Sequence, residues 1–183
     1  MANRTRGITS TAILALLWVV MTAGQTPAPA DRWAPVRFML GSWEGTTEGQ
    51  PGKGSVRREY RLVLRDRFIE ARNTATYPAQ EKNPKGEVHE DVGFISYDRA
   101  RTRLVLRQFH VEGFVNQYVE EHPAPSGNLV FTSEALENVP PGWRARETYI
   151  VHSPDEFEEV FELAQSGQPF EVYSRARLKR VKS

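Results

Sequence analysis

Ten short segments of this 183-residue chain alternate apolar and polar residues with a period of two, and this pattern constrains the fold most. The segments are rich in Val, Ile, Phe, Tyr and Thr, and Gly, Pro, Asp and Asn residues separate them, as is typical of β-strands joined by turns. They cover residues 39–48, 55–64, 68–77, 90–97, 103–112, 114–121, 128–137, 143–152, 156–164 and 170–181. None carries a convincing helical stripe, so the sequence predicts an all-β, antiparallel meander.

A sheet of about ten antiparallel strands is expected to close into an up-and-down barrel, because closure removes the unpaired edges. A barrel of this size is wide enough to hold a small ligand. The last predicted strand places the small residues Ser174 and Ala176 on one face with Phe170 and Leu178. Small side chains there leave space that a solid core would fill, so we expect an interior cavity.

The first thirty residues predict export. Arg4 and Arg6 precede an apolar run over residues 11–23, which has the length of a signal-peptide core. The run is shorter than the roughly 20 residues that a membrane-spanning helix needs. We expect a signal peptide over residues 1–24, a Pro/Ala linker over 25–36 and a barrel domain over 37–183. The protein is then periplasmic or secreted, without stable membrane insertion; an uncleaved anchor is the alternative, and the cleavage position stays open.

Charge and cysteine content exclude several function classes. The chain has 24 Lys and Arg against 23 Asp and Glu, and the first thirty residues hold two of the bases and no acid. The remainder therefore has 22 bases against 23 acids, a net charge of about −1. Nucleic-acid binding needs a basic face, so no nucleic-acid partner is expected. Because the chain has no cysteine, disulfides and thiolate chemistry are excluded.

The densest run of polar and aromatic residues lies over 106–122 and predicts a hairpin. A two-residue turn at Glu112-Gly113 would place Arg107 opposite Tyr118, where the pair could hold a ligand carboxylate. A one-residue bulge would exchange the faces, so the sequence leaves open which face points inward. Exterior cross-strand pairs are the alternative role for Arg107 and His110. The candidate ligand-binding residues of the hairpin are Arg107, Phe109, His110, Asn116 and Tyr118.

No catalytic or metal-binding constellation emerges from the sequence. His110 and Glu112 fall on one strand face, but a third metal ligand is not evident, so no metal site is predicted. The chain lacks a phosphate loop, a dinucleotide fingerprint and a Gly-x-Ser-x-Gly elbow. We therefore expect no catalytic residues; a small-molecule enzyme that uses the Arg107–Tyr118 hairpin, with His110 as general base, is the alternative.

The stretch LGSWEG over residues 40–45 resembles the first-strand signature of the calycins, the superfamily of lipocalins and fatty-acid-binding proteins. With EYRLVLRDRFIEAR downstream, it also resembles a family of uncharacterised bacterial barrels, from about Phe38 to the C-terminus. The resemblance implies that Gly41 and Trp43 close one end of the barrel. It also implies that a basic residue of the last strand, Arg175 or Arg177, packs over the tryptophan.

A more remote similarity connects the chain with nitrobindin and the haem-binding barrel domains. Those barrels hold the iron by a His in a Pro-His-Leu-Lys-Ala-like setting near the last strand. In the matching segment, residues 172–178, Ala176 and Leu178 fit the pattern and the His position falls on Tyr173. Tyrosine also ligates ferric haem. The similarity thus implies Tyr173 as a candidate ligand, and a haem barrel with NO or peroxide chemistry as an alternative function.

Taken together, the sequence predicts an exported calycin-like barrel that binds a small hydrophobic or amphipathic molecule in its interior. An acidic end group is the variant that Arg107 and Tyr118 would suit. No cofactor is expected outside the haem alternative. The sequence does not identify the ligand, separate a monomer from a homodimer, or exclude a purely structural barrel without a cavity.

Overall fold

The computed structural model describes residues 31–122 and 128–182. The chain divides into Met1–Ala30 and Asp31–Ser183, and only the second unit is described, so the expected signal peptide lies outside the described residues. The strands of this unit are β1 (Gly41–Gly49), β2 (Gly52–Val63), β3 (Phe68–Tyr77), β4 (Glu87–Asp98), β5 (Arg103–His110), β6 (Val115–Glu120), β7 (Leu129–Glu137), β8 (Arg144–Ser153), β9 (Glu156–Ala164) and β10 (Glu171–Arg180).

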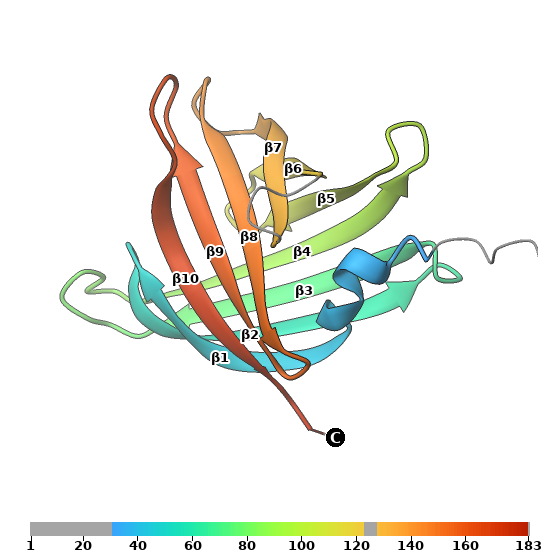
Figure 1. Ribbon diagram of the computed structural model, residues 1–183. Helices are drawn as coiled ribbons and strands as arrows, with labels where there is room; N and C mark the ends of the chain where they lie inside the picture. The colour runs from blue at the N-terminus through green and yellow to red at the C-terminus, as the bar shows by residue number, and fades with distance from the viewer. Residues whose placement is uncertain (1–30, 123–127, 183) are drawn as a thin grey trace, which may run out of the picture. The chain divides into compact units, whose positions relative to one another are not determined.

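Each strand pairs antiparallel with its neighbours in the chain, and β1 pairs with β10, so the sheet is a closed barrel (Figure 1). The predicted all-β, ten-stranded, up-and-down barrel is therefore confirmed. Inward-facing residues alternate with outward-facing ones along the strands, as β10 shows with buried Ala176 and Leu178 between exposed Arg175, Arg177 and Lys179. This alternation decides which side chains reach the interior.

One end of the barrel is closed by a short 3-10 helix, η1 (Ala34–Met39), which precedes β1 (Figure 1). Trp43 is fully buried beneath it, donates from Nε1 to the carbonyl oxygen of Met39 at 2.6 Å, and packs edge-on against Phe157 at 4.6 Å between ring centroids. Trp33 and Val36 are also buried. The linker was expected to run to residue 36; in fact the folded unit begins at Asp31, because these apolar side chains complete the core.

Arg180 provides the base over Trp43, whereas Arg175 or Arg177 was expected there. Its guanidinium carbon lies 4.2 Å from the Trp43 ring centroid, and it donates to the carbonyl oxygens of Leu40 at 2.6 Å and Phe38 at 3.0 Å. Trp43 and Arg180 are direct partners in the pairing of β1 with β10. Because alternate residues of β10 share a face, Arg180 lies on the side of Ala176 and Leu178.

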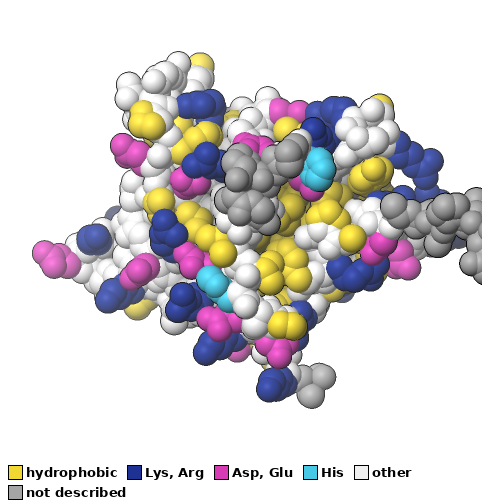
Figure 2. Space-filling view, viewed as in Figure 1, with side chains coloured by type: hydrophobic (Ala, Val, Ile, Leu, Met, Phe, Trp, Pro, Cys, Tyr) yellow, Lys and Arg dark blue, Asp and Glu magenta, His cyan; other side chains and the backbone are white. Residues whose placement is uncertain are grey.

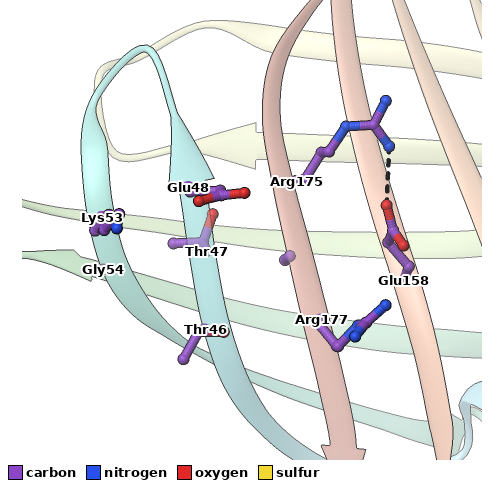
Figure 3. A pocket seen from close by; sticks show the side chains of 9 residues that line it. Thr46, Thr47, Glu48, Lys53, Gly54, Glu158, Arg175 and Arg177 are labelled. Carbon is purple, nitrogen blue, oxygen red and sulfur yellow. Dashed lines mark hydrogen bonds and ion pairs between the residues drawn. The ribbon is translucent and has the colours of Figure 1, made fainter.

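Arg175 and Arg177 lie on the outer surface. Arg175 forms an ion pair with Glu158 at 2.9 Å, and Arg177 lies 3.7 Å from Glu156. Figure 3 shows both arginines beside an outer hollow of about 570 Å³, where polar and charged residues such as Glu48 and Lys53 predominate. The face in Figure 2 mixes charges of both signs around a central group of hydrophobic side chains. Within the described part of the chain, no helix has the length and apolar character to span a membrane.

Two glycines of the first-strand motif have structural reasons. Gly41 has a φ of +116°, a backbone conformation that favours glycine, where the chain leaves η1 and enters β1. At Gly45, a Cβ atom would lie 1.9 Å from the carbonyl oxygen of Arg177 in the neighbouring β10. Only glycine therefore allows the first and last strands to approach this closely.

The Trp43–Arg180 contact predicts a contrast between two arginines of the same strand. We expect Arg180→Ala to lower the free energy of unfolding by about 2 kcal/mol, because charge-assisted hydrogen bonds to carbonyl groups are lost. Arg177→Ala removes an exposed ion pair and should cost less than about 0.5 kcal/mol. Trp43→Ala should cost about 3–5 kcal/mol. Urea unfolding followed by circular dichroism measures all three; equal losses in the two arginine variants would contradict this account of closure.

Candidate ligand-binding site

A cavity of about 620 Å³ occupies the part of the barrel away from η1. Small side chains at mid-barrel leave this space, among them Ala75, Ala145 and Ala176, with Ser174 beside them. The predicted cavity beside Ser174 and Ala176 is thus present. Larger apolar and aromatic side chains form its walls towards the loops, namely Tyr77, Phe114, Leu136, Trp143, Phe161 and Leu163. The volume lies in the range of about 300–1,000 Å³ that is typical of small-molecule sites.

The hairpin of β5 and β6 has a different register from the one expected. Its turn contains three residues, Val111, Glu112 and Gly113, with His110 and Phe114 hydrogen-bonded across it and Gly113 at a φ of +90°. Such a turn shifts the pairing by one residue from that of a two-residue turn. In consequence Leu106, and not Arg107, lies opposite Tyr118.

This register separates the predicted site residues into two groups. Arg107 is on the outer face, where it donates to Gln117 Oε1 at 2.7 Å and to Ser96 Oγ at 3.3 Å; Phe109 is 50% exposed beside it. The expected Arg107–Tyr118 clamp for a carboxylate is therefore wrong.

The second group lies inside the barrel. His110 and Asn116 line the cavity, and the Asn116 amide donates to the buried hydroxyl of Tyr118 at 2.9 Å. His110 stacks against Phe114, with 4.2 Å between ring centroids. The structure thus brings three of the five hairpin candidates together on the interior face.

Tyr173 reaches the cavity through an irregularity in β10. The register with β9 shifts between Val172 and Ser174, so Tyr173 and Ser174 both line the cavity while Val172 is 40% exposed. The Tyr173 ring packs edge-on against Phe161 at 5.6 Å. Burial raises the pKa of the Tyr173 hydroxyl, and Glu87 acts in the same direction.

Buried charged and polar residues form the floor of the cavity, and none of them is among the residues predicted from the sequence to bind a ligand. Arg58 is held by Glu159, with nitrogen–oxygen distances of 2.8 and 3.2 Å, and Asp91 accepts a hydrogen bond from Asn73 at 2.7 Å. The period-two pattern of the sequence could have identified them, because these residues occupy inward positions of their strands. Arg58 falls between the buried Val56 and Tyr60, two residues from each. Glu147 likewise alternates with Ala145 and Tyr149, and Glu159 with Phe157 and Phe161.

The floor has an excess of acids over bases. Arg58 is the one Lys or Arg side chain among the described residues that line the cavity. Burial alone would lower the pKa of Arg58, but the attraction and hydrogen bonds of Glu159 are stronger, so the pKa is raised. Burial raises the pKa of Asp91 to about 6 and raises the pKa of Glu147 well above its ordinary value. The acids that line the cavity are Glu87, Asp91, Glu112, Glu147 and Glu159.

Three buried oxygen atoms of the floor have no hydrogen-bond partner among the described residues: Asn73 Oδ1, Gln108 Oε1 and Glu147 Oε2. The Asn73 and Gln108 amide nitrogens both point to Asp91 Oδ1, at 2.7 and 3.5 Å. These contacts fix the orientation of the two amides and leave their oxygens as unpaired acceptors. Buried polar atoms are normally paired, since an unpaired one costs roughly 1–3 kcal/mol. The floor is therefore suited to a ligand with N–H or O–H groups, or to water in its place.

The raised pKa of Glu147 predicts a pH-dependent stability difference. In the folded protein Glu147 keeps its proton at pH values where the unfolded chain, with a pKa near 4.5, has lost it. This group therefore lowers stability progressively as the pH rises above about 4.5. We expect Glu147→Gln to be more stable than the wild type at pH 7. The difference between their free energies of unfolding should decrease as the pH falls and become constant below about pH 4. Urea unfolding across this range measures it; a difference independent of pH would contradict the assignment.

The fold and the cavity define this protein as a closed antiparallel β-barrel with an interior cavity. A family model described as "THAP4-like, heme-binding beta-barrel domain" matches residues 32–180, and the chain belongs to this family. The expected relationship with a nitrobindin-like barrel family is thereby confirmed.

Two solved structures extend the comparison. The crystal structure of Rv2717c from M. tuberculosis superposes with a TM-score of 0.62 at 16% identity, covering 84% of this chain and 99% of the other, and shows the fold alone. A fluorescence-activating β-barrel designed de novo has a TM-score of 0.41 at 16% identity, covering 79% of this chain and 94% of the other. A search of curated proteins gives no significant match.

Proposed function

We propose that this barrel binds a small amphipathic molecule in its interior, with an apolar body and an end group that donates hydrogen bonds, most favourably a protonated amine. The observation that carries the proposal is the cavity of about 620 Å³ with three unpaired oxygen atoms in its floor.

The walls would supply most of the binding free energy. Phe114, Leu136, Trp143, Phe161 and Leu163 present apolar surface to the cavity. Burial of apolar surface contributes about 25 cal/mol per Å², so about 200 Å² of ligand and wall would contribute on the order of 5 kcal/mol before the costs of association. The polar floor would then decide the orientation of the ligand.

The charge of the floor selects the end group. Because Arg58 is already paired with Glu159, neither Asp91 nor Glu147 has a cation of its own among the lining residues. An ammonium group would allow Glu147 to ionise and would satisfy acceptors that are otherwise unpaired. A carboxylate would face an acidic cavity without a free base. The sequence suggested a ligand with an acidic end group because Arg107 was expected to face the cavity. Since Arg107 lies on the outer face, we propose a ligand whose end group donates hydrogen bonds.

Matched ligands of equal chain length test this proposal. We expect an alkylamine to displace an environment-sensitive fluorophore from the purified protein at least about tenfold more effectively than the alkanoate, with the alkanol between them. Glu147→Gln should weaken the amine by about tenfold and change the alkanol little, since only the amine needs the carboxylate. Glu158→Gln, on the outer surface, is the control.

Two outcomes would contradict the proposal. Tighter binding of the alkanoate would overturn the choice of end group. Failure of the fluorophore and all three ligands to bind would overturn interior ligand binding itself. Mass spectrometry of molecules that co-purify with the native protein then identifies the natural ligand class.

We also propose that the protein is exported to the periplasm or secreted, on the basis of the basic start and apolar run before residue 24. N-terminal sequencing of the protein from the periplasmic or culture fraction should show a chain that begins between residues 24 and 31. A cytoplasmic protein that retains Met1 would contradict export.

Haem is the second candidate ligand, favoured by the family match and by the position of Tyr173. The residues present fit the group in two respects: the walls are apolar and aromatic, and the Tyr173 hydroxyl, which has no described hydrogen-bond partner, offers the iron an oxygen ligand. Bound haem would supply an iron centre for NO or peroxide chemistry. The acidic lining opposes formation of the phenolate and favours the amine ligand over haem.

Haem titration distinguishes the two candidates. If the barrel binds haem, we expect hemin to give a Soret band with one equivalent bound per chain, which Tyr173→Phe loses and Tyr173→His strengthens by at least about tenfold. Tyr77→Phe, which also lines the cavity, is the control for general loss of a phenol. A wild-type spectrum identical to that of free hemin, or to that of Tyr173→Phe, removes haem as a candidate.

A further inference from the structure

We propose that His89, His110 and Glu112 form a binding site for a divalent transition-metal ion, with zinc as the preferred ion, at the rim of the cavity. The inference goes beyond interior ligand binding and does not depend on the cavity floor. It departs from the sequence-based expectation that no metal site exists, because the third ligand comes from β4, a strand whose register with β5 the sequence did not reveal.

The geometry of the three side chains carries the proposal. One ligand atom from each of them lies within 4.8 Å of the others. His89 Nε2 and His110 Nδ1 are 3.2 Å apart. Glu112 Oε1 lies 2.7 Å from the other nitrogen of His89, Nδ1, so the exposed Glu112 carboxylate turns towards the histidine pair to complete the site. Zinc bonds of about 2.0–2.1 Å in tetrahedral geometry place neighbouring ligand atoms roughly 3.3 Å apart, so the histidine pair already has the required separation.

Strand pairing and the hairpin turn bring these residues together. Asp91 is the partner of His110 in the pairing of β4 with β5, so His89 lies two residues away at the same rim. The three-residue turn directly after His110 carries Glu112. The stacking of Phe114 on His110 fixes the ring of that histidine. The two histidines are thus held on two paired strands, which gives a more exact geometry than a mobile loop would, and Glu112 reaches them from the adjoining turn.

The donor set suits zinc. Two imidazoles and one carboxylate are the protein ligands of one common class of open zinc site, in which a fourth position is left for water or another ligand. All three residues line the cavity, so the fourth ligand would come from the cavity side.

A supporting hydrogen bond is also in place. The Asn116 amide lies 3.1 Å from His110 Nε2. The same amide nitrogen donates to the Tyr118 hydroxyl at 2.9 Å, so Asn116 is held in place and contacts the His110 ring at Nε2, while Nδ1 of that ring faces His89. Such outer hydrogen bonds orient histidine ligands in metal sites. The carboxylate of Asp91, 3.9 Å from His89 Nε2, adds negative charge beside the ion.

The test uses the purified protein without the expected signal peptide, residues 1–24; the protein is stripped of metal with a chelator and then titrated with Zn²⁺ or Co²⁺ alone. Competition with a chromophoric chelator should show one Zn²⁺ bound per chain. The visible absorption bands of bound Co²⁺ should have the intensity typical of a four- or five-coordinate site. His110→Gln, His89→Gln and Glu112→Gln should each weaken Zn²⁺ binding by at least about tenfold. The control is His152→Gln, which changes a histidine of the outer surface 3.6 Å from Glu158 and should leave the Zn²⁺ affinity unchanged.

Two results would overturn the site: less than one Zn²⁺ per chain in the wild type, or equal affinities in the wild type, His110→Gln and Glu112→Gln. Circular dichroism of each variant separates loss of binding from loss of folding. Glu112 lies in an exposed turn, so Glu112→Gln keeps the test decisive if a histidine variant fails to fold. Glu147→Gln should keep its Zn²⁺ affinity, which distinguishes failure of the metal site from failure of the amine-binding floor.

Discussion

The packing of Arg180 over Trp43 is the interaction on which the rest of the barrel depends. It joins the first strand, the last strand and the η1 helix at one point, and Arg180 also donates to the carbonyl oxygen of Pro154 in the β8–β9 turn. Charge-assisted hydrogen bonds to several carbonyl groups satisfy backbone atoms that closure would otherwise leave unpaired. The barrel is therefore sealed at one end by a planar cation above a buried indole.

A sealed end allows the other part of the barrel to remain hollow. The half near η1 is filled by large side chains such as Trp43, Phe131 and Phe157, which supply the apolar burial that a domain of this size needs. The other half contains small residues and a group of buried acids, which cost stability. Perturbed carboxyl groups and unpaired oxygens in a cavity are features of binding sites and not of solid cores.

Membership of a haem-binding barrel family establishes the fold, whereas the ligand depends on the side chains that face the cavity. In this chain those side chains combine apolar walls, an acidic floor and a histidine pair at the rim, with Tyr173 also facing the cavity. The amine, haem and metal proposals concern different parts of the same cavity. They are separable because Glu147, Tyr173 and His110 each enter only one of them.

The sequence by itself determined the ten strands, their order and the closed barrel, because period-two alternation and short turns leave few other arrangements. It also identified Gly41, Trp43 and the small residues beside the cavity, since each follows from local pattern or from the family resemblance. Only the tertiary structure decided the register of the β5–β6 hairpin, the choice of Arg180 over Arg175 and Arg177, and the meeting of His89 with His110. A single extra residue in a turn or a bulge exchanges the two faces of a strand, and neighbouring strands alone fix which face points inward.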